Sequence, residues 1–243
     1  MKTGIVVVAF GHDYERLALQ ALTYSRKFTD LPFHVMLGGN DGSRFDAIKE
    51  VSYTCFNRNQ NENRKVKLRL DEVTPFDLTL YMDCDSVIQR PGVEQFINLL
   101  DGVEMVFNPR ITFNPGQPIW NIYARCMKQF GIGKPISIHN GGIFAFRKTP
   151  VTGEFFKEWY RMWIEFGSGR EMPPLNCAIK KTGIAFNAFQ PGFFADSFMT
   201  DDVVVQHCWH ISSFSEKFGI TPWTENKPFD KGKHDDFRYE VYP

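Results

Sequence analysis

Two aspartates separated by one residue, Asp83 and Asp85, follow the apolar segment 80–82. Side chains alternate along an extended chain, so we expect both carboxylates on one side and Cys84 on the other. Two neighbouring carboxylates repel each other unless a cation lies between them, and Mn²⁺ or Mg²⁺ bound by carboxylates and substrate phosphates suits this arrangement. The pair therefore predicts a metal-dependent site. Two turn or capping aspartates are the alternative interpretation.

Short apolar runs alternate with helical apolar spacing, which predicts an α/β fold with a parallel sheet and helices on its faces. In such sheets ligands bind at the carboxyl ends of the strands, where this pattern places the two aspartates. Gly11 is expected to allow the turn after the first strand, with Asp13 as the N-cap of the first helix. We expect strands over residues 5–10, 33–37, 51–56, 78–82 and 103–107, helices over 14–28, 65–73, 93–100 and 119–130, and loops over 57–63 and 108–118.

Composition is typical of one large globular α/β domain. The chain has 243 residues, 43% of them hydrophobic and 23% charged, which excludes a disordered chain, a collagen and a coiled coil. Aromatic residues make up 15% and recur at helical spacing between residues 155 and 166. That spacing favours core packing, with the lining of an acceptor site as the alternative.

The charges balance, with 28 basic and 28 acidic residues, whereas proteins that bind nucleic acid by counterion release normally carry a basic excess. A local basic cluster over residues 64–69 is the exception. Five cysteines without a CxxC spacing predict reduced thiols rather than a disulfide framework or a structural zinc site. No apolar run approaches the roughly 18 residues of a membrane span, so we expect a cytoplasmic protein.

Several segments carry a further signal through their order along the chain. They are the apolar strand 6–10 followed by Tyr14, then Lys67, the stretch 75–85 with both aspartates, the segment 140–144 (Asn-Gly-Gly-Ile-Phe), the segment 171–176 (Glu-Met-Pro-Pro-Leu-Asn) and the strand 203–210 with His207 and His210. In this order they resemble the GT-A fold glycosyltransferases, especially the glycogenin-like and lipopolysaccharide-galactosyltransferase-like group.

The resemblance implies a GT-A fold with a Rossmann-like, mixed but mostly parallel sheet flanked by helices. Residues 1–243 would form a single GT-A-like domain, with a nucleotide-binding half over about 1–107, an acceptor half over about 108–223 and a polar tail over 224–243. The implied activity is metal-dependent transfer of a sugar from a nucleotide-diphosphate donor, with a UDP-sugar favoured. The acceptor stays open among a glycan, a protein, a small molecule and DNA.

The same resemblance assigns the metal ligands. Asp85 is expected to be the firmer ligand, Asp83 to bridge the metal and the donor ribose, and His207 to be the third ligand, with His210 in reserve. An imidazole beside carboxylates favours Mn²⁺ over Mg²⁺. A core histidine is the alternative for His207.

Donor-binding roles are implied for Phe10, Tyr14, Lys67 and Gly142. Phe10 and Tyr14 would stack on the base, with core packing as the alternative. Lys67 would neutralise the diphosphate, with a solvated helix face as the alternative. Gly142 belongs to a segment expected to form a turn that brings backbone close to the sugar, or a plain hairpin turn.

Catalytic roles are implied for Asn140, in that same segment, and for Glu171, which would contact the sugar at the reaction centre. Glu171 has a second interpretation, as a helix N-terminal acid favoured by the macrodipole. The sequence departs from the family pattern in that Gly141 replaces the usual Ser or Thr and Glu171 stands where Asp is more common. Lys217 is separated from 222–223, so the family's late diphosphate contact is not reproduced.

Two other functions compete with this interpretation. A HAD-type phosphatase would also use Asp83 and Asp85 at a strand end, with Asp201 and Asp202 as its late acidic pair, but its motif normally opens the chain. A non-catalytic nucleotide-sugar or nucleic-acid binding module would use the basic cluster instead.

Overall fold

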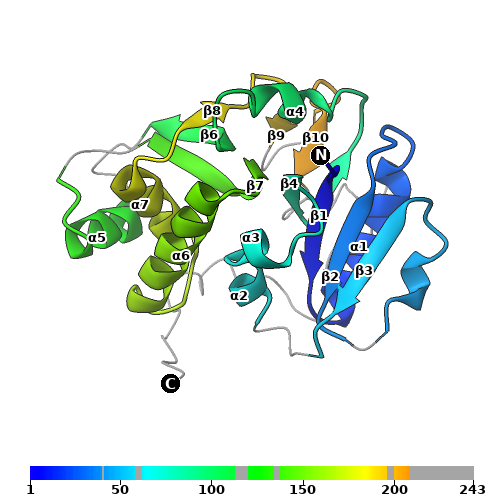
Figure 1. The fold of residues 1–243 in the computed structure, drawn as a ribbon, viewed down its shortest axis with the longest axis horizontal. Helices are drawn as coiled ribbons and strands as arrows, with labels where there is room; N and C mark the ends of the chain where they lie inside the picture. The colour runs from blue at the N-terminus through cyan, green and yellow to red at the C-terminus, as the bar shows by residue number, and fades with distance from the viewer. Residues whose placement is uncertain (40, 58–61, 113–119, 134–136, 196–199, 208–243) are drawn as a thin grey trace.

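The structure is a computed structural model that describes all residues except 40, 58–61, 113–119, 134–136, 196–199 and 208–243. Its central feature is a seven-stranded sheet in the order β3-β2-β1-β4-β7-β6-β8 (Figure 1). The strands are β1 (Thr3–Ala9), β2 (Phe33–Leu37), β3 (Val51–Cys55), β4 (Leu78–Asp83), β6 (Met105–Thr112), β7 (Ser137–Arg147) and β8 (Phe186–Ala188). β7 runs antiparallel to both of its neighbours, and the other pairs are parallel, which confirms the predicted mixed, mostly parallel sheet.

The central strands of the sheet are buried on both faces, which explains their continuous apolar runs. In β1, Ile5 and Val7 face one core cluster while Val6 and Val8 face another. A strand buried on both faces needs apolar residues at every position. β1 pairs in parallel with β4 so that Val8 lies opposite Asp83, and the aspartate therefore stands at the carboxyl edge of the sheet.

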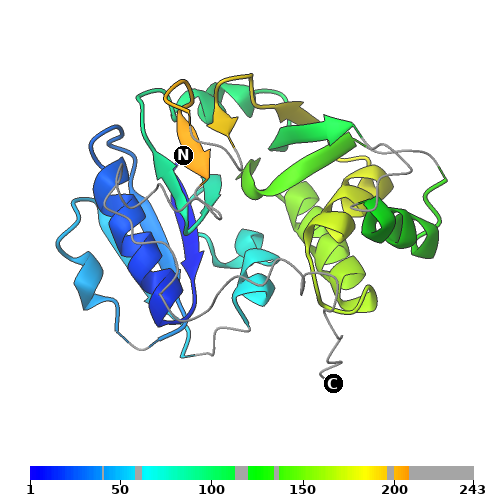
Figure 2. The ribbon, with the colours of Figure 1, turned by 180° about the vertical axis from the view of Figure 1, so that it is seen from behind.

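Helices cover both faces. They are α1 (His12–Ser25), α2 (Asn63–Lys67), α3 (Leu70–Val73), α4 (Gln95–Leu99), α5 (Asn121–Gln129), α6 (Pro150–Glu165) and α7 (Met172–Thr182), and a short 3-10 helix, η1, covers Ser43–Phe45. Figure 2 shows α1 in front of the parallel strands, where it packs Ala18 and Leu22 against Ile5 and Val7. The short helices α2 and α3 pack on the opposite cluster together with the aromatic side chains of α6.

The ends of the helices correct one expectation. α1 begins at His12 with Gly11 as its N-cap, not Asp13, which lies in the first turn. Gly11 has φ 98°, a left-handed conformation that glycine adopts without steric cost, so the chain enters the helix two residues earlier than Asp13 suggested. α6 begins with a capping box in which the side chains of Thr149 and Thr152 each accept from the other's backbone N–H.

Three further expectations need correction, and one is confirmed. The helix expected over residues 65–73 is two short helices, α2 and α3. Residues 108–112, expected in a loop, continue β6. Asn140-Gly141-Gly142, expected in a turn, lies inside β7, where the pairing with β6 shifts register. The aromatic stripe of α6 packs in the core as expected, with Phe155, Phe156 and Trp159 buried.

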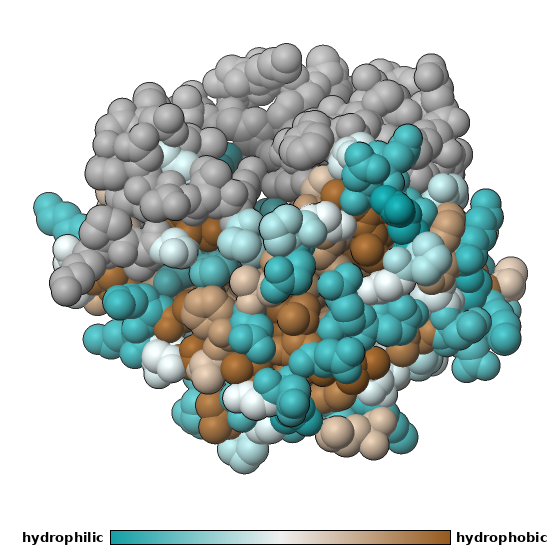
Figure 3. Space-filling model, turned by 90° about the horizontal axis from the view of Figure 1, so that it is seen from above, coloured by the Kyte–Doolittle hydropathy of each residue, from teal (hydrophilic) through white to brown (hydrophobic). Residues whose placement is uncertain are grey.

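The described surface mixes hydrophilic and apolar residues, as the view from above shows (Figure 3). Among the described residues, every helix is too short or too polar to cross a membrane.

Asp71, in the first turn of α3, makes the fold sensitive to pH. Its Oδ1 is buried without a hydrogen-bond partner, and burial followed by the charge of Glu72 raises its pKa from 3.8 to about 6. The folded state therefore disfavours the carboxylate: the penalty is absent below pH 3.8 and complete above about pH 6. Because the side chain is partly exposed, we expect Asp71→Asn to stabilise the protein by only about 1 kcal/mol at pH 7.5.

Urea unfolding of Asp71→Asn at pH 7.5 and pH 4.5 tests this expectation, with Asp101→Asn, at an exposed position, as the control. The stabilisation should be largest at pH 7.5 and shrink at pH 4.5. An equal effect at both pH values would contradict the assignment of the penalty to Asp71 ionisation.

Candidate active site

Three side chains with metal-binding atoms meet at the carboxyl edge of β4. A second, three-stranded sheet in the order β5-β10-β9 contains β5 (Ser86–Ile88), β9 (Phe194–Ala195) and β10 (Val205–His207). β10 pairs antiparallel with β5 so that His207 lies opposite Ser86, directly after the aspartates. The Nε2 atom of His207 lies 3.1 Å from Asp85 Oδ1 and 4.0 Å from Asp83 Oδ2.

The two aspartates lie on one side, but not because of the strand alternation that the sequence suggested. β4 ends at Asp83, and Cys84 and Asp85 form a turn that leads into β5. The turn, rather than strand alternation, brings the carboxylates together. One ligand atom from each of Asp83, Asp85 and His207 lies within 4.8 Å of the other two.

This group has the donors that a divalent cation requires. Two carboxylate oxygens and an imidazole nitrogen form a set that suits Mn²⁺ and also accommodates Mg²⁺. Burial acts to raise the pKa of Asp85, but the adjacent His207 outweighs it and the pKa is lowered. Asp85 is therefore held as the carboxylate, the form that binds a cation.

A buried lysine connects this group to Glu171. The Nζ atom of Lys67 lies 3.0 Å from Asp83 Oδ1 and 3.1 Å from Glu171 Oε1, and Lys67 is only 4% exposed. Arg64 Nε lies 3.3 Å from the other oxygen of Glu171. The solvated helix face that was the alternative for Lys67 is therefore wrong, because its ammonium group is enclosed by two carboxylates.

The charges of this network keep Glu171 and Lys67 ionised. Burial alone would raise the pKa of Glu171, but Lys67 and Arg64 lower it to about 2. Burial alone would lower the pKa of Lys67, but Asp83 and Glu171 raise it above its ordinary value. Glu171 is the N-cap residue of α7 without a capping hydrogen bond from its side chain, so its carboxylate serves the ion pairs instead.

β7 brings its glycines against these acids. The backbone N–H of Gly142 donates to Asn140 Oδ1 at 2.6 Å. A Cβ atom on Gly142 would lie 2.8 Å from Asp83 Oδ2, and one on Gly141 would lie 3.8 Å from Glu171 Oε1. Asn140 and Gly142 thus lie beside the acidic group, but within a strand rather than in a turn.

The contact at Gly142 leads to a test of the site. Gly142→Ala places a methyl group 2.8 Å from Asp83 Oδ2 and 3.0 Å from Asn140 Oδ1, so the Asp83 carboxylate has to shift from its position in the site. We expect Mn²⁺ affinity to fall by about tenfold or more, in the range seen when the positions of ligands are disturbed. Isothermal titration with Mn²⁺ measures this, and Gly133→Ala, where a Cβ meets nothing within 4 Å, is the control. Unchanged affinity would show that the methyl group leaves Asp83 in place.

The two aromatic candidates occupy different surroundings. Phe10 is fully buried and packs its ring 5.7 Å from that of Phe56, which is the core packing left open as its alternative. Tyr14 is partly buried, and burial followed by the Cys84 thiol raises its pKa to about 12. Asp83 and Asp85 also act on this pKa, so Tyr14 lies near the acidic group.

The basic cluster 64–69 is partly neutralised by ion pairs. Lys67 is buried between Asp83 and Glu171, Arg64 pairs with Glu171, and Arg69 pairs with Glu72. The side chains of Arg64 and Arg69 are nevertheless 47% and 50% exposed, and Lys65 is exposed as well. Three of the four charges therefore have carboxylate partners, which weakens the nucleic-acid binding alternative.

Asp201 and Asp202 are not part of the acidic group. They are exposed and lie at Arg90, beyond the end of β5, whereas Asp83 and Asp85 precede β5, so they do not form a late acidic pair beside these aspartates. His210, Lys217, residues 222–223 and the polar tail 224–243 lie outside the described residues.

Sequence reasoning missed Tyr81 and Arg64 as parts of the site. The hydroxyl of Tyr81 donates to Asp83 Oδ1 at 2.6 Å. Alternation along β4 places residues 81 and 83 on one side, which is the signal that could have identified Tyr81. The pairing of Arg64 with Glu171 spans more than a hundred residues and has no local signal.

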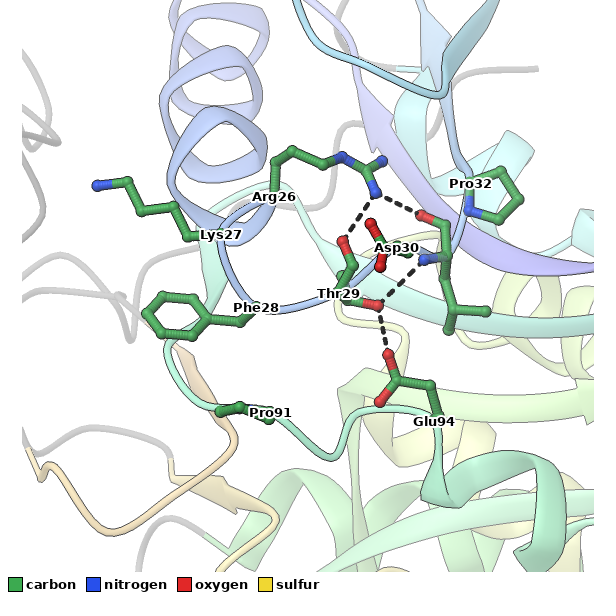
Figure 4. A pocket seen from close by; sticks show the side chains of 9 residues that line it. Arg26, Lys27, Phe28, Thr29, Asp30, Pro32, Pro91 and Glu94 are labelled. Atoms are coloured by element: carbon green, nitrogen blue, oxygen red, sulfur yellow. Dashed lines mark hydrogen bonds between the residues drawn. The ribbon is translucent and has the colours of Figure 1, made fainter.

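A hollow of about 540 Å³ lies elsewhere, at the loop between α1 and β2. It is lined by residues 26–32 with Pro91 and Glu94, and Figure 4 shows Thr29 bonded to Glu94 and Arg26 bonded to backbone carbonyls. β2 starts beside this hollow, whereas Asp83 stands at the carboxyl end of β4. The hollow therefore lies at the opposite edge of the sheet from the acidic group.

Comparison with known proteins agrees at the level of fold. No family model matches the chain, and no curated protein matches it in sequence. Among solved structures, the galactosyltransferase LgtC in complex with donor and acceptor sugar analogs aligns with a TM-score of 0.61 and 14% identity, over 92% of this chain and 98% of its own. Mouse xyloside xylosyltransferase 1 aligns with a TM-score of 0.57 and 10% identity, over 85% and 97%.

A third similar structure is the bifunctional glycosyltransferase WbbM, with a TM-score of 0.58 and 12% identity, of which this chain covers 50% while 91% of this chain is aligned. All three are glycosyltransferases. This chain therefore has the GT-A fold of these enzymes.

Proposed function

We propose that this protein is a metal-dependent glycosyltransferase that moves a sugar from a nucleotide-diphosphate donor to an acceptor. The observation that carries the proposal is the meeting of Asp83, Asp85 and His207 at the carboxyl edge of β4 in a chain with the GT-A fold. Ligands of open α/β sheets bind at this edge. The adjoining Lys67 bonds to Asp83 and, on its other side, to Glu171.

The acidic group supplies the cation site of the proposal. Asp83, Asp85 and His207 would hold Mn²⁺ or Mg²⁺. When bound, the cation acts as a Lewis acid that stabilises negative charge on the leaving diphosphate. Asp83 would also contact the donor ribose, and Tyr14 would contribute to donor binding, as the resemblance to the family implies.

Glu171 supplies the negative charge at the proposed reaction centre. Its pKa of about 2 keeps it ionised at every pH at which an enzyme of this kind operates. A fixed carboxylate stabilises the positive charge that develops at the sugar carbon as the bond to the diphosphate breaks. Lys67 bonds to both Asp83 and Glu171, so it holds the cation site and the reaction centre in one arrangement.

The two halves of the chain have separate roles in this proposal. Residues 1–107 would bind the nucleotide, with a UDP-sugar as the favoured donor, and residues 108–223 would bind the acceptor. Asn140 and Gly142 of β7 belong to the second half and lie beside Asp83 of the first. The acceptor is a glycan, a protein, a small molecule or DNA.

Thermal unfolding in the presence of nucleotides tests the proposed donor class. A ligand at one hundred times its Kd stabilises the folded state by about 2.7 kcal/mol, which is readily measured. We expect UDP or a UDP-sugar to raise the Tm with Mn²⁺ and to lose that effect in EDTA. Stabilisation by another nucleoside diphosphate instead of UDP would assign a different base to the donor. The absence of stabilisation by every nucleotide would contradict the proposal.

A further inference from the structure

The two oxygens of the Asp83 carboxylate have different surroundings. Oδ1 accepts from the Tyr81 hydroxyl at 2.6 Å and from Lys67 Nζ at 3.0 Å. Oδ2 lies 4.0 Å from His207 Nε2, on the side where Gly142 leaves room that a Cβ atom would fill. One oxygen is thus held by two donors while the other faces the remaining members of the proposed cation site.

Tyr81 is built rigidly into the fold. It is 2% exposed, and its ring stacks on that of Phe144 with the centroids 4.9 Å apart and the planes at 27°. Phe144 is also its cross-strand neighbour, since β4 and β7 pair with Tyr81 opposite Phe144. The ammonium group of Lys67 lies 4.9 Å from the Tyr81 ring centroid. Because the ring is fixed, the position of the hydroxyl is fixed as well.

A fixed hydrogen-bond donor can hold the Asp83 carboxylate in one orientation. Without it, a carboxylate can rotate about its terminal bond at little cost, since torsions between sp³ and sp² carbons have broad minima. Lys67 fixes the distance to Asp83, but it is a point charge shared with Glu171 and restrains the rotation of the carboxylate less than a directional donor does. A short O–H···O⁻ bond from a packed ring restrains the carboxylate directionally.

We propose that Tyr81 is a positioning residue whose hydroxyl holds Asp83 Oδ1, so that Oδ2 is presented to the divalent cation together with Asp85 and His207. This inference rests on the proposed function for the existence of the cation site. It adds a residue of β4 that determines how tightly that site binds. A carboxylate that is already turned toward the cation loses less freedom on binding.

Tyr81→Phe removes one oxygen atom and leaves the ring stacked on Phe144, so the fold is retained. Partners that orient metal ligands typically contribute 10–100-fold to metal affinity. We therefore expect the Kd for Mn²⁺, measured without donor from the electron paramagnetic resonance signal of free Mn²⁺, to rise by about 10–100-fold. The matched control is Tyr160→Phe, a half-buried tyrosine of α6 that packs on Trp163.

The outcomes separate this inference from the proposed function. If wild type and Tyr160→Phe bind Mn²⁺ and Tyr81→Phe binds it more weakly, Tyr81 positions Asp83. If all three bind Mn²⁺ equally, the hydroxyl only satisfies a buried donor, and the inference is overturned while the cation site stands. If wild type binds no Mn²⁺, the proposed cation site itself is overturned. Thermal unfolding in EDTA, expected to be cooperative for all three proteins, shows that weakened binding is not lost structure.

Discussion

We expect Asp85→Ala to lower cation-dependent turnover of the proposed nucleotide-sugar donor by a factor of at least about 10²–10³, while the protein remains folded. The size follows from the loss of charge stabilisation at a leaving group, which costs about this much when a single stabilising contact is removed. Asp85 is the carboxylate nearest to His207, at 3.1 Å, so its removal deprives the proposed site of a carboxylate and His207 of its partner. Release of the nucleoside diphosphate with Mn²⁺ measures the loss.

The folded state should tolerate this change. Removing one of two adjacent carboxylates relieves their mutual repulsion, which offsets the lost bond to His207. The control is Asp202→Ala, an exposed aspartate whose side chain is 94% accessible and which we expect to leave turnover unchanged. Turnover by Asp85→Ala at the wild-type rate would show that Asp85 is not part of the catalytic site.

Lys67→Met has the largest expected effect on stability, a loss of about 3–5 kcal/mol in the free energy of unfolding. Lys67 is 4% exposed and lies between Asp83 Oδ1 and Glu171 Oε1. Replacing it with an apolar side chain leaves two carboxylates in a largely enclosed site without the cation that compensates their burial. Urea unfolding in EDTA measures the loss, because EDTA prevents an added metal from replacing the lysine charge.

Two variants check the reason for that loss. Lys65→Met, on the exposed side of α2, should change the free energy of unfolding by less than about 0.5 kcal/mol, as is usual for surface positions. Adding Glu171→Gln to Lys67→Met should recover part of the stability, since one uncompensated charge is removed. If Lys67→Met unfolds at the same urea concentration as Lys65→Met, the buried ion pairs contribute nothing to the fold.

The sequence was most informative where burial dictates residue type. β1 and β4 are buried on both faces, so their apolar runs predicted both strands and the place of Asp83 at the end of one. The mixed sheet and the GT-A fold followed from the order of several short segments rather than from any one of them. His207 stood at the end of an apolar run, and the structure brings it to Asp85.

Local signals failed where a tertiary contact determines the backbone. Asn140-Gly141-Gly142 looks like a turn, yet it is part of β7. A Cβ on Gly142 would lie 2.8 Å from Asp83 Oδ2, and one on Gly141 would lie 3.3 Å from Met172 Cγ, so these glycines permit close packing rather than a turn. The same holds at Cys84, where a turn interrupts the expected extended chain. A glycine pair predicts either a turn or a close approach, and sequence alone does not distinguish them.

Charges were misjudged for a related reason. The basic residues 64–69 are close in sequence, but Arg64 and Lys67 share a partner, Glu171, that lies 104 residues from Lys67. The sequence pattern shows the basic cluster, but it does not show the distant carboxylate that pairs with Arg64 and Lys67. The pairing became visible only when α2, β4 and the start of α7 were placed together.

The most direct test of the proposed function is the release of nucleoside diphosphate from a panel of UDP- and GDP-sugars, with Mn²⁺ and with EDTA. We predict release with Mn²⁺ from at least one donor, the loss of that release in EDTA and in Asp85→Ala, and no cleavage of a generic phosphate ester. Cleavage of p-nitrophenyl phosphate that disappears in Asp83→Asn, without turnover of any nucleotide-sugar, would contradict the proposal and favour a phosphatase.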